Sequence, residues 1–324
     1  MKKIITILLT VVAVLGISAF AFTACGGNEP AGKYDVFAPD GAPVLALADM
    51  WGENAGDAEL NYGVIAETDV NAKMVSGEAD FIVAPINVGA SVHAGYASGK
   101  MPYDYKLLNV TSWGVIYFTT NDDGYKTREQ CADADEFLSQ FDGKTMSTIG
   151  LAAIPGKTVQ YLFGEAGADV TLNGADATVI QQSYVKGDAT TAIFAQPAIT
   201  GVQSSKGEDA VTVLASVSDI YKEVTGKDFP MAGLFVRADV LENDPEAVSA
   251  VDARVKSSVE AFNGNIDEVS VKAESIEGFS LKAAVIKKAY DKMNVAYKNS
   301  EGSKSDVQTL LANIGAPCDD GLFA

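Results

Sequence analysis

Three predicted helix starts carry residue types that could hold a small polar molecule. A helix N-terminus offers unpaired N–H groups and a partial positive charge, which suit an anion or a polar head group. Each start follows the end of a predicted strand; the three are Asp40-Gly41-Ala42-Pro43, Ile86-Asn87-Val88 and Ala153-Ile154-Pro155-Gly156-Lys157-Thr158. The third loop adds a lysine charge and a hydroxyl, whereas Asp40 would favour an amine ligand over an anion. Capping and turn chemistry alone would also account for these residues.

The usual sequence signatures of catalysis are absent. His93 is the only histidine, and its surroundings, SVHAGYASG, lack the strand-turn-helix context of a nucleophile elbow. No GxGxxG, phosphate-binding loop or CxxC occurs, and the presence of a single imidazole argues against a structural zinc site. We therefore predict no catalytic residue, no metal site and no cofactor. We expect His93 to lie on a helix, either hydrogen-bonded within the protein or exposed to solvent.

The N-terminus has the layout of a secretory signal. Lys2 and Lys3 precede an apolar run from Ile4 to Phe22, and small residues then lead to Cys25. The sequence FTACGG resembles the bacterial lipobox, in which the cysteine becomes the lipidated first residue. A single uncleaved anchor is the alternative, because the run is about long enough to span a bilayer. We expect a signal peptide over residues 1–24, lipidation at Cys25, and a tether over 25–33.

Composition indicates an ordinary globular protein. The 324 residues are 48% hydrophobic and 21% charged, enough for about two domains. The formal net charge of −19 repels phosphate backbones, so nucleic acid is not expected as a partner. Solubility explains this charge without any partner. Beyond Cys25 only Cys131 and Cys318 remain, and whether they pair stays open.

From Tyr34 the chain alternates β-rich runs with helical patterns, which is typical of parallel sheets with right-handed crossovers. Strands are predicted at 33–39, 60–66, 80–85, within 105–120, and at 144–149, 177–182, 191–196, 211–215 and 231–236. Helices are predicted from Pro43 through Trp51, over 69–77 with Asp69 as cap, from a cap at Asn87, over 128–141 and 156–166, and after Pro197. From Asp244 onward the sequence is nearly all helical.

Five segments, in order, resemble the substrate-binding lipoproteins of ABC importers, in the branch with sulfonate-, nitrate- and thiamine-precursor-binding proteins. Together they cover most of the chain after the signal. The segments are PDGAPVLALADMWG, NAKMVSGEADFIVAPINVGASVHAGYASGK, FDGKTMSTIGLAAIPGKTVQYLFGEAGAD, DATTAIFAQPAIT and FPMAGLFVRADVLENDPEAVSAV.

The resemblance implies a two-lobe, type II periplasmic-binding-protein-like α/β fold. Each lobe would be a mostly parallel sheet flanked by helices, with a helical C-terminal tail and ligand-induced hinge closure. Lobe I would comprise 34–114 and 226–324, and lobe II would comprise 115–225. The chain departs from well-known members in having only three arginines, whereas sulfonates and carboxylates are often clamped by arginine. Arg128 falls on a predicted surface helix, and Arg237 stands where the family has an outward-pointing basic residue.

The resemblance also suggests further ligand contacts. Trp113 and Tyr117 flank the expected first crossover and could stack on a flat ligand or pack in the hinge. Tyr184 follows a predicted strand end in lobe II. Gln196 could reach the cleft with its amide, and Met231 could form an apolar wall. Few arginines and several aromatic residues favour a pyrimidine or other heteroaromatic ligand slightly over a sulfonate.

The function implied is that of a lipid-anchored, monomeric receptor on the extracytoplasmic face of a bacterial membrane. It would bind a small molecule, pass it to an ABC permease and catalyse no reaction. One alternative is a sensory or adhesive lipoprotein that presents its ligand to a partner. Another is an enzyme on the same scaffold, as in thiamine-precursor synthesis, but the Cys/His-rich iron-binding motif of those enzymes is missing.

Overall fold

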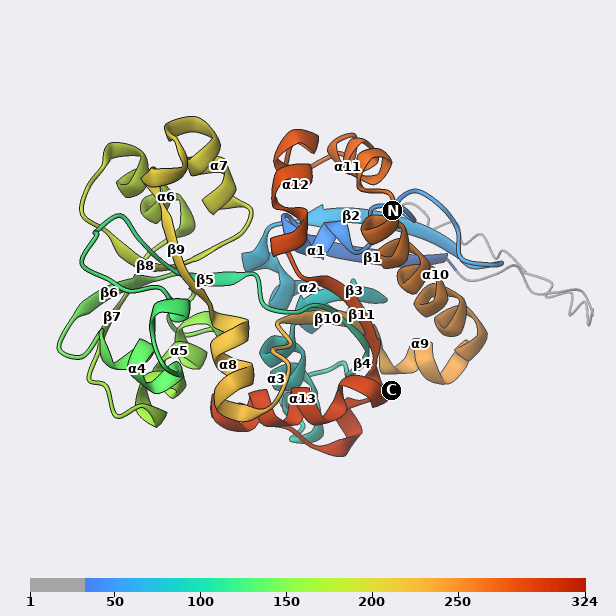
Figure 1. Ribbon diagram of the computed structural model, residues 1–324. Helices are drawn as coiled ribbons and strands as arrows, with labels where there is room; N and C mark the ends of the chain where they lie inside the picture. The colour runs from blue at the N-terminus through green and yellow to red at the C-terminus, as the bar shows by residue number, and fades with distance from the viewer. Residues whose placement is uncertain (1–32) are drawn as a thin grey trace, which may run out of the picture. The chain divides into compact units, whose positions relative to one another are not determined.

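The computed structural model describes residues 33–324, whose strands form two separate sheets (Figure 1). We call the six-stranded sheet and its flanking helices lobe I, and the five-stranded sheet and its helices lobe II. The strand order is β11-β4-β10-β3-β1-β2 in lobe I and β7-β6-β8-β5-β9 in lobe II. This confirms the predicted two-lobe α/β architecture. The predicted signal peptide, Cys25 and all of the predicted tether except Lys33 lie outside the described residues.

Most strands of each sheet run in the same direction, as expected for crossover-connected sheets; the exceptions are β10 and β11 in lobe I and β5 in lobe II. Strand β1 is parallel to β2 and β3, and β6 is parallel to β7 and β8. The lobe I strands are β1 (Lys33–Pro39), β2 (Glu59–Ile65), β3 (Phe81–Pro85), β4 (Tyr105–Ser112), β10 (Ala232–Arg237) and β11 (Val295–Asn299). The lobe II strands are β5 (Ile116–Thr120), β6 (Thr145–Thr148), β7 (Thr171–Gly174), β8 (Thr191–Ala195) and β9 (Thr212–Ser216).

Two connections carry the chain between the lobes. The first links β4 to β5 through residues 113–115, and the second links β9 to β10 through α8 (Val217–Thr225) and residues 226–231. The strand that receives each connection, β5 or β10, runs antiparallel to both of its neighbours. Each lobe therefore contains one central strand reached directly from the other lobe.

Helices cover both sheets. Lobe I has α1 (Ala42–Leu45), α2 (Val70–Ser76), α3 (Ile86–Ala97), α9 (Ala238–Asn243), α10 (Pro245–Gly264), α11 (Ile266–Glu274), α12 (Ala283–Ala289) and α13 (Ser300–Asn313). Lobe II has α4 (Ala134–Ser139), α5 (Ile154–Glu165), α6 (Ala177–Lys186) and α7 (Ala198–Lys206). The helical C-terminal region belongs to lobe I, as Figure 1 shows in orange and red. Within residues 33–324 none of the helices combines the length and hydrophobicity that a membrane span requires.

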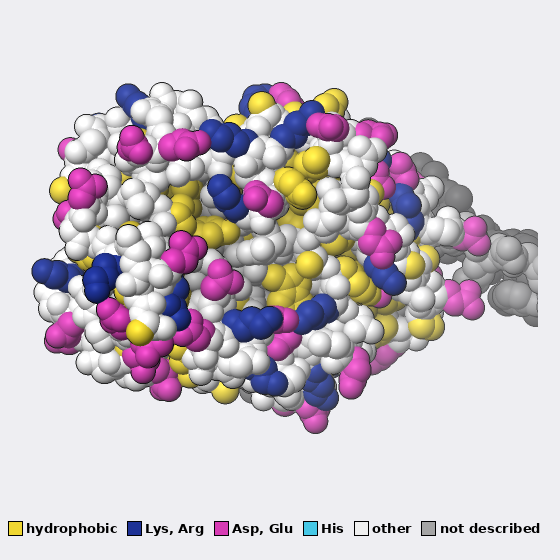
Figure 2. Space-filling view, viewed as in Figure 1, with side chains coloured by type: hydrophobic (Ala, Val, Ile, Leu, Met, Phe, Trp, Pro, Cys, Tyr) yellow, Lys and Arg dark blue, Asp and Glu magenta, His cyan; other side chains and the backbone are white. Residues whose placement is uncertain are grey.

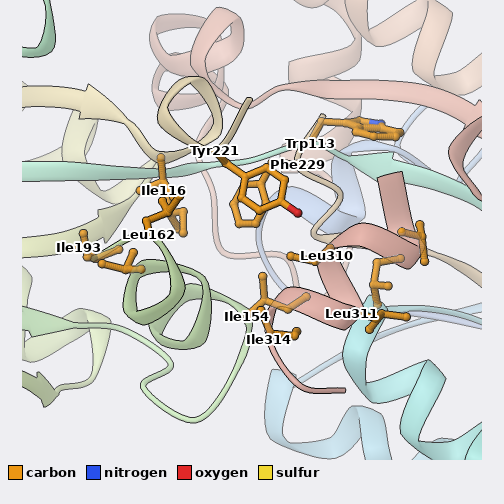
Figure 3. Close-up of a cluster of buried hydrophobic side chains, with 14 of the residues drawn as sticks. Trp113, Ile116, Ile154, Leu162, Ile193, Tyr221, Phe229, Leu310, Leu311 and Ile314 are labelled. Carbon is orange, nitrogen blue, oxygen red and sulfur yellow. The ribbon is translucent and has the colours of Figure 1, made fainter. Parts of the chain in front are cut away.

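One hydrophobic core runs from lobe I into lobe II beside the crossovers. It includes Ile154 and Leu162 of α5, Tyr221 of α8, and Leu310 and Leu311 of α13 (Figure 3). Helix α5 contacts α13, and on another side of the lobes α7 contacts α12. The lobes are thus joined by apolar packing as well as by the chain, so their relative motion must preserve or shear this packing.

Several predicted elements differ in the structure. The segment 177–182, predicted as a strand from its β-branched residues, lies in helix α6, because Ile180 and Tyr184 bury one helical face and Gly187 ends the helix in the left-handed region (φ 77°). The strand of this region is β7. Residues 128–141 do not form one helix: a single 3-10 turn at Arg128–Gln130 is followed by α4, which begins at Ala134. Asp133 is the N-cap of α4, and its carboxylate accepts the Glu136 N–H.

The predicted helix caps also need correction. Helix α3 begins at Ile86 with Pro85 at its N-cap, so Asn87 lies inside the first turn. The side chain of Asp69 makes no capping hydrogen bond to α2, which instead continues from a 3-10 turn over Glu67–Asp69. Helix α1 is shorter than predicted, and β11 interrupts the helical C-terminal region.

His93 joins the C-terminus to lobe I. Its Nδ1 lies 2.6 Å from Asp104 Oδ1, and its Nε2 lies 3.0 Å from Asp319 Oδ1. The hydrogen bond from His93 holds the pKa of Asp319 below its ordinary value. His93 is accordingly a structural residue of a helix, with both ring nitrogens hydrogen-bonded.

The two cysteines of the described residues do not pair. Cys131 is buried, Cys318 is exposed, and both are free thiols.

Candidate functional site

A cavity of about 270 Å³ opens between the two lobes. Its walls are the carboxyl ends of parallel strands and the first residues of the helices that follow, which is where open α/β sheets bind ligands. Pro39 ends β1, Pro85 ends β3 and Ala195 ends β8, and Ile116 and Ala232 begin the two antiparallel strands. The topology of both sheets therefore places the ends of several strands around this one cavity.

Six of the residues predicted as ligand contacts line this cavity. They come from the connection between β1 and α1 and the start of α1, from the first turn of α5, from the residue after β8 and from the residue before β10. The six are Asp40, Gly41, Ala42, Pro155, Gln196 and Met231. The structure brings them together although they are spread over 192 positions of sequence, from 40 to 231.

The other predicted contacts lie elsewhere, and three of them are aromatic. Trp113 donates its Nε1–H to the carbonyl of Ala296 (2.9 Å) and packs in the interlobe core (Figure 3). Tyr117 donates its hydroxyl to the carbonyl of Lys292 (2.7 Å). Tyr184 is buried on α6, where its hydroxyl lies 2.8 Å from Thr119 Oγ1, and does not follow a strand end as predicted. Desolvation raises the pKa of Tyr117 and Tyr184 above the usual range.

The remaining five predicted contacts lie on helices α3 and α5, outside the cavity lining. They are Asn87, Val88, Gly156, Lys157 and Thr158. Lys157 extends toward α13, where its Nζ lies 3.4 Å from the carbonyl oxygen of Ile314. Lys157 thus bridges the two lobes next to the cavity.

The cavity lining is mostly aliphatic, and the sequence analysis missed most of it. Pro43, Ala153 and Ile154 belong to two of the predicted helix starts. The missed residues are Pro39, Glu67, Pro85, Ser112, Val115, Ile116, Ile149, Ala177, Ala195, Pro197 and Ala232. Their shared signal is position, because nearly all lie within a few residues of a strand end. No residue of this lining, all of it in the described part of the chain, is aromatic, and none is Lys, Arg or His.

Two carboxylates are the only charged groups of the lining. Asp40 and Glu67 are exposed residues of lobe I, and Asp40 Oδ1 accepts the N–H of Ser280 (3.0 Å). Elsewhere on the surface shown in Figure 2, basic and acidic side chains are interspersed. Among residues 33–324 no group of three or more His, Cys, Asp or Glu side chains is placed to hold a metal ion.

Gln196 and Ser112 are the buried polar residues of the lining, and Gln196 carries its amide. Gln196 is 3% exposed, and its Oε1 accepts hydrogen bonds from the Oγ1 hydroxyl (2.8 Å) and the N–H (3.3 Å) of Thr200. Its Nε2 is buried with no hydrogen-bond partner among the described residues. An unpaired buried donor is costly, so this amide is suited to a ligand that brings an acceptor.

Gly156 has a packing role that explains its position. A Cβ at this residue would lie 2.4 Å from the backbone oxygen and 2.5 Å from the Cα of Leu151, so only glycine lets α5 approach the loop that carries Ala153. We expect Gly156→Ala to lower the free energy of unfolding by about 1–3 kcal/mol through overpacking.

Gly164 of the same helix is the matched control for that substitution. Nothing lies within 4 Å of a Cβ built there, so Gly164→Ala should raise stability by about 0.5–1 kcal/mol. Urea denaturation of both variants measures the difference. Equal effects of the two substitutions would contradict a close-packing role for Gly156.

No protein-family model and no curated protein matches the sequence. Solved structures do resemble it. An ABC transporter protein from Parabacteroides distasonis aligns over 91% of this chain and 99% of its own, with a TM-score of 0.69 and 17% identity. The periplasmic aliphatic sulphonate-binding protein of Escherichia coli aligns over 91% of this chain and 96% of its own, with a TM-score of 0.66 and 13% identity. The periplasmic nitrate-binding protein of Synechocystis aligns over 87% of this chain and 80% of its own, with a TM-score of 0.60 and 12% identity. The chain thus has the fold of periplasmic binding proteins.

Proposed function

We propose that this protein is an extracytoplasmic solute-binding receptor that delivers a small organic molecule to an ABC importer. The observation that carries the proposal is the cavity: it lies between two lobes that are linked by two crossovers, and both lobes line it. Closure of the lobes around a ligand would bury it on all sides. The fold shared with proteins named as sulphonate- and nitrate-binding supports the same role.

The chain acts in this proposal by binding alone. The cavity presents one buried amide, the buried residue Ser112 and two exposed carboxylates. No hydrogen bond between described residues pairs the Ser112 hydroxyl with a base, as activation of a nucleophile would require. The closed form of a monomeric receptor would then dock on the permease. A lipid at Cys25 would keep the protein at the outer face of the membrane, and this part of the proposal rests on the sequence.

The ligand class predicted from the sequence, sulfonate-like or heteroaromatic, stays a prediction. The lining offers neither the guanidinium clamp that suits a sulfonate nor an aromatic face for stacking. Small, mostly aliphatic walls instead suit a compact ligand, since the cavity volume is at the lower end for small-molecule sites.

Native mass spectrometry of the purified protein, followed by its addition to proteoliposomes that contain the importer, tests the proposed function. We expect a bound small molecule and ligand-dependent stimulation of ATP hydrolysis. Ala177→Trp, at an exposed residue of α6 in the cavity lining, should abolish both; Ala253→Trp, at an exposed residue of α10 outside the lining, should abolish neither. Ligand binding without stimulation would favour the sensory or adhesive alternative.

A further inference from the structure

The charged side chains of the described cavity lining, Asp40 and Glu67, both belong to lobe I. Lobe II presents a buried amide donor and three helix N-termini, whereas lobe I presents one long helix N-terminus, that of α3 after Pro85, beside its two carboxylates. The inference drawn from this difference rests on the proposed function, because it names the ligand class of the same site.

The orientation of the Gln196 amide is fixed on the lobe II side. The backbone N–H of Thr200 can only donate, and it points to Oε1 of Gln196, so the amide oxygen must face Thr200. The NH₂ group is therefore the free end of the side chain. Because it is buried and has no partner within residues 33–324, only a ligand acceptor or an ordered water could satisfy it.

Three helices of lobe II add to this donor character. Helices α5, α6 and α7 all begin at residues of the cavity lining, at Ile154, Ala177 and next to Pro197. None of the three residues at their N-caps makes a side-chain capping hydrogen bond. The positive ends of these helices and the Gln196 NH₂ group consequently favour a carboxylate or another acceptor on this side.

The lobe I side favours the opposite charge. Neither Asp40 nor Glu67 forms a salt bridge with any described residue, and no basic residue shares the cavity lining. Their negative charges are thus uncompensated at the site and would attract an ammonium group, although solvent weakens the attraction. They would also repel a ligand that carries only negative charge.

We infer that the ligand is a small aliphatic zwitterion, with its carboxylate toward Gln196 in lobe II and its ammonium group toward Asp40 and Glu67 in lobe I. Ala42, Ile116, Ala195 and Ala232 supply the apolar contact for a short carbon chain between the two groups. Such a ligand contacts both lobes with opposite charges, so its binding draws the lobes together.

Isothermal titration calorimetry with matched probes tests this inference. The probes are alanine, valine, 3-aminopropanoate and 4-aminobutanoate, each beside the carboxylate and the amine of the same carbon skeleton, with ethanesulfonate and nitrate added as simple anions. We expect at least one amino acid to bind at least tenfold more tightly than both of its matched partners. A carboxylate, sulfonate or nitrate that binds as tightly as every amino acid would overturn the inference.

Two variants locate the charges of the ligand. Gln196→Glu keeps an acceptor for Thr200 but removes the donor, and should weaken the amino acid about 10- to 150-fold, the worth of a hydrogen bond to a charged group. Asp40→Asn with Glu67→Gln should weaken it about tenfold at low salt and leave the matched carboxylate unaffected or tighter. Gln160→Glu, Asp57→Asn and Glu242→Gln, at exposed residues outside the lining, should change nothing.

The outcomes separate this inference from the proposed function. If mass spectrometry finds a purely anionic bound molecule that stimulates the importer, the inference is wrong and the receptor function stands. If none of the amino acids binds, the inference is likewise wrong, whatever the importer assay shows. If no small molecule binds and the importer does not respond, both fail.

Discussion

Replacing Phe229 by alanine is expected to lower the free energy of unfolding by about 3–5 kcal/mol, the usual cost of truncating a fully buried phenylalanine. Phe229 is completely buried in the second crossover, and its ring centroid lies 5.1 Å from that of Tyr221 (Figure 3). It also contacts the first crossover, because a Cβ at Gly114 would lie 3.0 Å from its Cδ1. Phe229 therefore packs where both connections between the lobes meet.

The same substitution tests whether the two lobes unfold together. The hydrophobic core that contains Phe229 continues into both lobes, so urea denaturation should show one transition with a lower midpoint. Tyr96→Ala, at an exposed residue of α3, should change stability by less than about 0.5 kcal/mol. Two transitions in the Phe229→Ala variant, one of them unchanged, would show that the lobes are independently stable.

The place of the site could be predicted from sequence because it follows from topology. Strand ends and helix starts are visible in the residue pattern, which predicts Asp40 and Pro155 as contacts, and the family resemblance adds Gln196. All three line the cavity. Parallel strands bring their carboxyl ends to one edge of a sheet, so residues far apart in sequence meet there without any specific pairing signal.

The direction in which a side chain points could not be predicted in this way. Trp113 and Tyr117 are close to lining residues in sequence, yet Trp113 turns toward the carbonyl of Ala296 in β11 and Tyr117 toward that of Lys292, between α12 and β11. Both carbonyls lie about 180 positions further along the chain. Residues 177–182 are predicted as a strand that ends shortly before Tyr184. They form part of helix α6 instead, because burial of one helical face outweighs the strand propensity of Thr178, Val179 and Ile180.

Arg237 shows the same difficulty for a charged residue. The family resemblance places a basic residue there that points outward, whereas the Arg237 side chain is only 18% exposed. Its guanidinium lies 3.0 Å from Asp80 Oδ1, bonds Asp239 Oδ1 (2.6 Å), and donates to the carbonyl of Gly77 at the end of α2 (2.6 Å). Arg237 thus joins β10, the start of β3 and a helix end within lobe I.

Removing this guanidinium should be costly because Asp80 would remain half-buried without its cation. We expect Arg237→Met to lower the free energy of unfolding at pH 7–8 by about 2–4 kcal/mol, somewhat below the cost of breaking a fully buried pair. Arg254→Met, which removes an ion pair with Glu53 at the surface, should cost less than about 1 kcal/mol. Asp80→Asn combined with Arg237→Met should restore part of the loss, because the uncompensated charge is gone.

The pH dependence of Arg237→Met identifies Asp80 as the cause. Desolvation already raises the pKa of Asp80 in the native protein, while the N–H of Asp35 and then Arg237 oppose the rise. Without Arg237 this pKa rises further, so the folded variant takes up a proton at a higher pH than the unfolded chain does. A raised native pKa gives stability that is present at low pH and lost as pH increases. The deficit of Arg237→Met relative to the wild type should therefore shrink as pH falls from 8 to 5 in urea titrations. A deficit independent of pH, or one that Asp80→Asn leaves intact, would assign the loss to the Gly77 and Asp239 contacts instead.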